Sequence, residues 1–132
     1  MAQSPGEWFR QADYDMDTAQ AMLDAGRYIY TVFMCHLSIE KALKGIYVAK
    51  LKQVPPKTHN LGFLLGRVEL AATDAQRNFL ADLSRASVGT RYPDMLTGLV
   101  SQFTKQKSCS VLDEAKGVLE WLKSELAKCS VS

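Results

Sequence analysis

The longest periodic pattern of apolar residues runs from Tyr28 to Leu51 and predicts one helix of about six turns. It contains no proline, and its only glycine is Gly45, so nothing in it breaks a helix. Turning each residue by about 100° gives two apolar strips. The first strip is Val32, Cys35, Ile39, Leu43 and Ile46, and the second is Phe33, Leu37, Val48 and Leu51.

Polar residues lie between the two strips, in the row His36, Glu40, Lys44 and Tyr47. Buried charge costs free energy unless each group finds a partner, so this row is the first functional candidate. The opposite side of the predicted helix carries small residues that suit either water or a closely packed helix: Thr31, Ser38, Ala42, Gly45 and Ala49.

An amphipathic helix is also predicted before this segment, with Ser4 as its cap, Pro5 in the first position and Glu7 completing a capping box. Its apolar face recurs at steps of three and four residues, through Trp8, Ala12, Asp15, Ala19, Met22 and Leu23. Asp15 therefore lies at the edge and bonds nearby backbone, or it pairs with a cation of the next helix. The helix ends near Gly26, so the two helices should form an antiparallel hairpin.

Helical patterns return after the pair Pro55-Pro56, which ends the long helix and holds the chain extended. A short apolar helix follows, with Thr58 or Asn60 as its cap. Further helices are predicted at 73–86, opened by a capping box, and at 107–128, whereas 87–104 reads as a loop with at most a short helical turn. The chain is thus predicted to be one domain, residues 1–132, folded as an all-α antiparallel up-down bundle of four to five helices.

Composition narrows the function classes. The hydrophobic fraction of 47% and charged fraction of 23% are typical of globular proteins, and no apolar run is long enough to span a membrane. The start MAQSPGEW lacks the basic and apolar regions of a secretion signal, so we expect a cytoplasmic protein. The three widely spaced cysteines, Cys35, Cys109 and Cys129, fit reduced structural thiols. A net charge of +2 is too small to indicate nucleic-acid binding by itself, although it leaves room for a local anion site.

The histidines and the carboxylate of the polar row admit several interpretations. His36 and Glu40 have the i, i+4 spacing of metal ligands, but two groups are too few, so neither a metal nor another cofactor is expected. Glu40 and Lys44 form either a surface ion pair or part of a binding site. His59 either fixes its loop by a cap or hydrogen bond, or acts as a general base.

Arg91-Tyr92-Pro93-Asp94 is a different kind of motif. Pro93 pushes Tyr92 out of the helical region, so an arginine and an aromatic ring are presented on a rigid extended turn. An arginine beside an aromatic face recognises phosphate together with a base, unless the arginine is held by a carboxylate such as Glu40 or Asp15. The candidate ligand-binding residues are Arg91, Tyr92, Asp94, Glu40, Lys44, Lys41, His36 and Asp15.

In these motifs the chain resembles the HEPN domain family. The resemblance rests on the spaced pattern from Trp8 to Leu23, on Gly26-x-Tyr28, and on Cys35-His36-x3-Glu40-Lys41-x2-Lys44. It continues through Pro55-Pro56-x-Thr58-His59-Asn60-Leu61 and Arg91-Tyr92-Pro93-Asp94, in order and over most of the chain. It implies an up-down bundle that dimerises, with the long second helix and the arginine loop facing a shared cleft. It also implies a nucleotide- or RNA-binding role. Many members pair with a minimal nucleotidyltransferase in a two-gene system of the toxin–antitoxin kind, and others are metal-independent ribonucleases.

One departure from the family bears on catalysis. The ribonuclease members carry a histidine after the arginine, with four to six residues between them, whereas residues 92–98 here contain none. We therefore expect a non-catalytic binding module. The alternative is a ribonuclease toxin in which Arg91 acts with His59 in place of the missing histidine.

Overall fold

The computed structural model describes residues 3–129, which form six helices and no strand. The helices are α1 (Pro5–Asp24), α2 (Tyr28–Leu51), α3 (Leu61–Val68), α4 (Asp74–Gly89), α5 (Pro93–Gln102) and α6 (Lys105–Cys129). The predicted all-α class is confirmed. Among the described residues there is one helix more than the largest number predicted, because α5 occupies the segment expected to be a loop.

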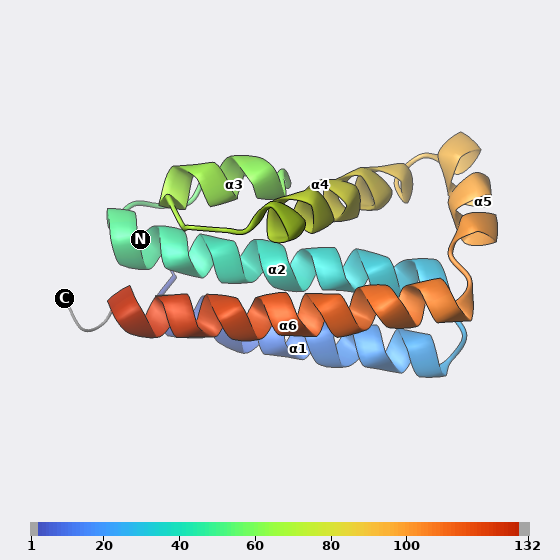
Figure 1. The fold of residues 1–132 in the computed structure, drawn as a ribbon, viewed down its shortest axis with the longest axis horizontal. Helices are drawn as coiled ribbons and strands as arrows, with labels where there is room; N and C mark the ends of the chain where they lie inside the picture. Colours follow the sequence, from blue (N-terminus) through green and yellow to red (C-terminus); the bar gives the residue numbers. More distant parts are fainter. Residues whose placement is uncertain (1–2, 130–132) are drawn as a thin grey trace.

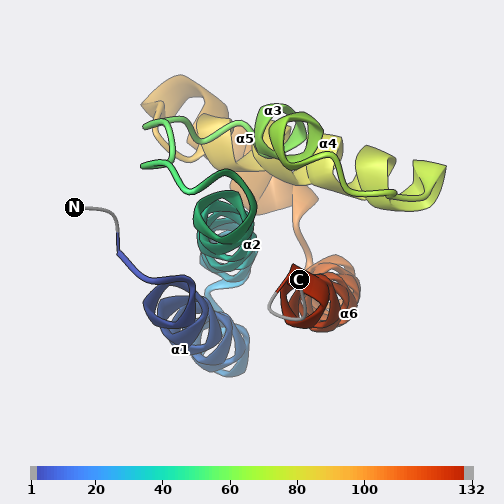
Figure 2. The ribbon, with the colours of Figure 1, turned by 90° about the vertical axis from the view of Figure 1, so that its left-hand side faces the viewer.

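The helix α2 lies at the centre of the molecule. Figure 1 shows α1, α2 and α6 running along the long axis, with α3 and α4 above α2 and α5 across one end. Viewed along the helices, α2 lies between α1 and α6 on one side and α3 and α4 on the other (Figure 2). The most extensive packing is between α1 and α2, followed by α2 and α6. Each of the main layers therefore buries its apolar side chains against α2.

The hairpin of α1 and α2 forms as the sequence predicts. The Ser4 hydroxyl accepts a hydrogen bond from the Glu7 backbone N–H at 3.1 Å. The small-residue face of α2 packs on α1, where the Ser38 hydroxyl donates to the Ala12 carbonyl at 2.7 Å. Close approach also requires Gly45, because a Cβ there would lie 2.9 Å from the ring of Phe9.

The two apolar strips of α2 have different surroundings. Every member of the first strip is fully buried. The second strip, defined as Phe33, Leu37, Val48 and Leu51, remains half-buried. On α1 the inner face includes Phe9 and Met16, whereas Trp8 and Met22 lie half-buried at its edge. The second strip is thus covered less completely than the first by the described residues.

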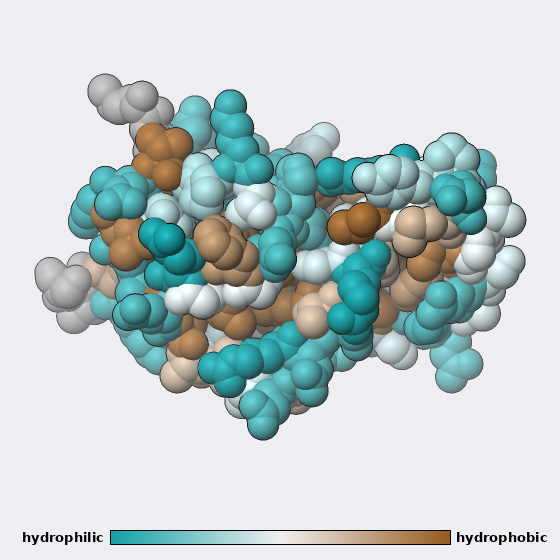
Figure 3. Space-filling model, turned by 90° about the horizontal axis from the view of Figure 1, so that it is seen from above, coloured by the Kyte–Doolittle hydropathy of each residue, from teal (hydrophilic) through white to brown (hydrophobic). Residues whose placement is uncertain are grey.

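The segment 87–104 is helical over most of its length, so the prediction of a loop is wrong. Pro93 occupies the first turn of α5, where its fixed φ and missing N–H are compatible with a helix. Leu96 and Leu99 then pack against the core. Gly89 permits this contact, since a Cβ there would lie 2.4 Å from a methyl carbon of Leu99. Toward this end of the molecule apolar residues interrupt the polar surface (Figure 3).

Local capping signals elsewhere are realised in the structure. Asn60, rather than Thr58, caps α3 by accepting the Phe63 N–H at 3.0 Å. Thr73 and Gln76 form the predicted capping box of α4. That helix continues three residues beyond its predicted end, and α6 begins two residues before its predicted start at 107. Within residues 3–129, no helix combines the length and apolar character required to cross a bilayer.

Candidate functional site

Glu40 is the centre of a buried polar cluster on α2. Its Oε2 accepts a hydrogen bond from Lys44 Nζ at 3.0 Å, and its Oε1 accepts one from His59 Nδ1 at 2.9 Å. The side chains of Glu40 and Lys44 are only 7% and 10% exposed. The pair is therefore buried, and the interpretation of a weak surface ion pair is wrong. A buried pair is far more sensitive than a surface pair to the loss of one partner.

His59 connects the loop before α3 to this cluster in two ways. Besides the bond from its ring to Glu40, its backbone carbonyl accepts a hydrogen bond from His36 Nε2 at 2.8 Å. The interpretation that His59 fixes its loop is thereby confirmed. The His59 side chain is nevertheless 52% exposed, and with Nδ1 donating to Glu40 its Nε2 is available to a ligand.

His36 is almost completely buried and neutral. Burial lowers the pKa of its imidazole, and the charges of His59 and, least of all, Arg91 act in the same direction, although the hydrogen bond to the His59 backbone and the charge of Glu40 oppose them. Because a carbonyl can only accept, the proton of the neutral ring lies on Nε2. His36 Nδ1 is 3.9 Å from Glu40 Oε1, too far for a hydrogen bond, so His36 contributes an uncharged wall to the cluster.

Asp15 and Lys41 form a second pair beside the first. Lys41 Nζ lies 2.8 Å from Asp15 Oδ2, and the Asp15 side chain is only 8% exposed. Of the two interpretations of Asp15, the structure shows the pairing with a cation of the following helix and not a bond to nearby backbone. This contact joins α1 to α2 and neutralises both charges.

The Arg91 loop lies between α4 and α5. Tyr92 has extended backbone angles (φ −123°, ψ 120°), as its position before Pro93 requires, and the residue is 52% exposed. Asp94 is exposed in the first turn of α5. Arg91 is exposed as well, and its charge is the weakest of the influences on the pKa of His36.

The expected contact between Arg91 and Glu40 is not formed. Both carboxylate oxygens of Glu40 bond other groups, Lys44 and His59, and Asp15 pairs with Lys41. Among residues 3–129, Arg91 has no carboxylate within ion-pair distance. One ion pair therefore lies within α2 and a second joins α2 to α1, whereas the guanidinium of Arg91 has no such partner among these residues. Within the same range, no three His, Cys, Asp or Glu side chains are placed to hold a metal ion together.

Comparison with known proteins identifies the family. The model of the HEPN domain matches residues 6–126. The chain belongs to the HEPN domain family. No curated protein matches this HEPN domain significantly.

Two crystal structures resemble this HEPN domain in fold. TT1696 from Thermus thermophilus has a TM-score of 0.79 and 24% identity over 91% of this chain and 96% of its own. ST0689, an archaeal HEPN homologue, has a TM-score of 0.76 and 21% identity over 94% of this chain and 98% of its own. At these identities the likeness concerns the fold alone.

Part of the site in this HEPN domain could be found from sequence and part could not. The i, i+4 spacing of Glu40 and Lys44 indicates their contact directly. The hydrogen bond from His59 to Glu40 joins residues 19 apart in the sequence, across a loop whose path the two prolines do not specify. No periodic signal indicates the bond between the His36 ring and the His59 backbone, which holds that loop in place.

Proposed function

We propose that this HEPN domain is a cytoplasmic, non-catalytic module that binds the phosphate of a nucleotide or of RNA. In this proposal it acts as a homodimer, together with a minimal nucleotidyltransferase partner, in a two-gene system of the toxin–antitoxin kind. The observation that carries the phosphate-binding proposal is the exposed Arg91, which has no carboxylate within ion-pair distance among residues 3–129, whereas Glu40 and Asp15 are already paired.

The chemistry of the loop supports phosphate as the ligand. A guanidinium donates two parallel hydrogen bonds to phosphate oxygens, and such charge-assisted bonds are stronger than neutral ones. Tyr92 follows Arg91 directly and is half-exposed on a backbone that Pro93 restricts. A base attached to the phosphate would stack on this ring. His59 Nε2 offers a further polar contact, whereas Lys44 and Lys41 act through the ion pairs that hold the site together.

Binding of a labelled single-stranded RNA and of labelled ATP, measured by fluorescence anisotropy, tests the proposal. We expect Arg91→Ala to weaken binding by about tenfold or more, the effect of losing a charge-assisted phosphate contact. Arg10→Ala is the matched control, because Arg10 is also exposed but pairs with Glu7 on α1. Affinities that are the same in Arg91→Ala and in the control would refute the role of Arg91.

The homodimer is proposed from the second apolar strip. Phe33, Leu37 and Val48 are half-buried along α2, and burial of such a strip against a second copy removes apolar surface from water. Light scattering should give twice the chain mass at micromolar concentration, and Leu37→Glu should give the monomer. A monomeric wild-type protein would contradict the proposal.

The nucleotidyltransferase partner is proposed from family membership. A nucleotidyltransferase encoded next to this gene should co-purify with the chain when the two are expressed together. Growth arrest by the chain alone would instead favour a toxin.

A metal-independent ribonuclease is the second candidate, and one contact favours it. His59 Nδ1 donates a hydrogen bond to Glu40, and a carboxylate orients the imidazole in the same way in many acid/base sites. His59 Nε2 would then be free to accept a proton from a substrate. Because no histidine follows Arg91 at the spacing of the ribonuclease members, we expect no cleavage of single-stranded RNA in EDTA. Cleavage that disappears in both Arg91→Ala and His59→Ala would replace the binding module with the ribonuclease.

A further inference from the structure

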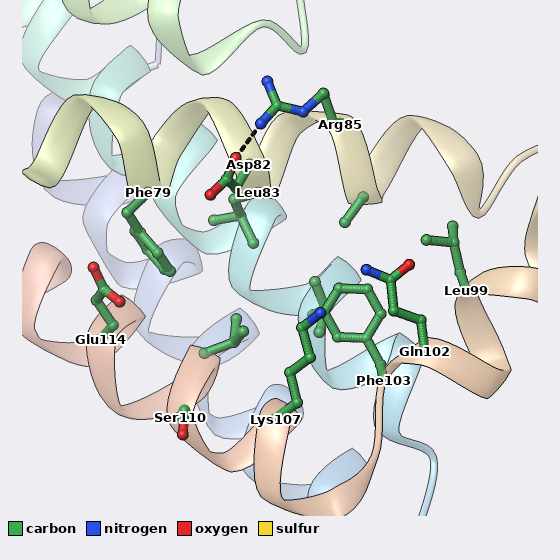
Figure 4. Close-up of a pocket in the computed structure, with 13 residues that line it drawn as sticks. Phe79, Asp82, Leu83, Arg85, Leu99, Gln102, Phe103, Lys107, Ser110 and Glu114 are labelled. Atoms are coloured by element: carbon green, nitrogen blue, oxygen red, sulfur yellow. Dashed lines mark hydrogen bonds and ion pairs between the residues drawn. The ribbon is translucent and has the colours of Figure 1, made fainter.

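A cavity of about 590 Å³ lies between α4, α5 and α6, and none of its lining residues belongs to the Glu40 cluster. Figure 4 shows side chains of the three helices converging on it. Its volume is within the range of small-molecule sites, roughly 300–1,000 Å³. The cavity forms because α5 crosses the end of the bundle. The sequence pattern of residues 87–104 predicts a loop in place of α5, so it does not predict the cavity either.

The inner wall of the cavity is apolar. Val32 of α2, Leu83 and Ala86 of α4, and Val111 of α6 form the part nearest the core. Two aromatic rings stand at different ends, Phe79 from α4 and Phe103 from the segment after α5. A flat apolar group would contact side chains on both long walls.

The charged side chains at the rim are distributed unequally. Arg85 and Asp82 pair with each other, so their opposite charges offset each other at the rim (Figure 4). Lys107 Nζ lies 4.8 Å from the centroid of the Phe103 ring. No carboxylate of the described residues lies within ion-pair distance of Lys107, and Gln102 lines the same cavity. Glu114 is at the other end, near Phe79.

This arrangement has one unpaired cation at one end and one unpaired carboxylate at the other, as far as residues 3–129 extend. An acidic group is attracted to Lys107 and repelled by Glu114, and Gln102 offers an amide N–H within the same cavity. The charges thus favour one orientation of a ligand, and the apolar wall favours a ligand whose body is apolar.

We propose that this cavity binds a small organic anion with a flat apolar body, and that its acidic group pairs with Lys107. The cavity is separate from the phosphate site at Arg91, so the two proposals stand or fall independently. No bond is made or broken in the proposed complex.

Two fluorescent probes with nearly the same ring system test the proposal on the full chain. 8-Anilinonaphthalene-1-sulfonate carries an acidic group, and N-phenyl-1-naphthylamine does not. We expect the sulfonate to bind with one site per chain. We expect Lys107→Glu to lower the affinity for the sulfonate by about tenfold, because one charge-assisted contact is lost. The affinity for the neutral probe should change by less than about twofold.

Lys105→Glu is the matched control. Lys105 is exposed in the first turn of α6 but does not line the cavity, so its charge reversal should leave both probes unchanged. Glu114→Gln should strengthen sulfonate binding, because it removes the repelling carboxylate. Ser110→Trp, placed at an exposed lining position, should block both probes while the helical circular dichroism is retained.

Several results would overturn the proposal. Equal loss of sulfonate binding in Lys107→Glu and Lys105→Glu would attribute the effect to general charge. Undiminished binding of both probes in a folded Ser110→Trp variant would place the probe elsewhere, for example on the second apolar strip of α2. Loss of both probes in Leu37→Glu, with binding intact in Ser110→Trp, would assign the site to that strip.

Discussion

The buried pair of Glu40 and Lys44 should make a large and measurable contribution to stability. Glu40→Gln and Lys44→Met each remove one charge at nearly constant volume, so neither opens a cavity. The remaining partner stays in a site where its side chain is 10% exposed or less. Removing one member of a buried pair costs about 3–5 kcal/mol, and we expect about 3 kcal/mol here because Lys44 lies at the edge of the core.

A double-mutant cycle isolates the interaction from the single changes. The double variant Glu40→Gln/Lys44→Met leaves no unpaired charge, so it should be little less stable than either single variant. The coupling free energy should then be about 2 kcal/mol. Urea unfolding followed by circular dichroism, at one protein concentration and with equal m values, measures all four proteins.

The exposed pair of Asp82 and Arg85 provides the control. Asp82→Asn should cost less than about 0.5 kcal/mol, because water screens exposed charges and replaces the lost partner. A coupling free energy below about 0.5 kcal/mol between Glu40 and Lys44 would refute the reasoning. So would a Glu40→Gln variant as stable as Asp82→Asn.

Three further predictions concern buried groups. Burial raises the pKa of the Cys35 thiol to about 12, so a pulse of iodoacetamide at neutral pH should label the exposed Cys109 and spare Cys35 by mass spectrometry; equal labelling would contradict this. Gly45→Ala should destabilise by about 1–2 kcal/mol in urea, because its Cβ would lie 2.9 Å from an aromatic carbon of α1, whereas Gly117→Ala, which meets nothing within 4 Å, should stabilise. Because burial lowers the pKa of His36 below its ordinary value of 6.5, the unfolded chain binds more protons in acid. The unfolding free energy should therefore fall as the pH drops below that value, and a His36→Gln variant with an unchanged slope would contradict the assignment.

The sequence alone determined the helices that depend on local signals. Periodic apolar residues fixed α1, α2 and α6, and the caps at Ser4 and Thr73 marked helix starts, because both signals act over one or two turns. The segment containing α5 is one whose helix the local sequence pattern does not predict. Its glycines and Pro93 interrupt the helical periodicity of the sequence. The helix is instead stabilised by the packing of Leu99 of α5 on Gly89 of α4, a contact between two elements.

The same division applies to the site and the cavity. The contact of Glu40 with Lys44 follows from helix geometry, since residues four apart share a face. Only the tertiary structure decides whether Arg91 or His59 completes the cluster. One oxygen of Glu40 bonds Lys44 and the other bonds His59, so the cluster is completed without Arg91. The cavity between α4, α5 and α6 depends on the angle at which α5 crosses the bundle, and only the packing of residues distant in sequence sets that angle.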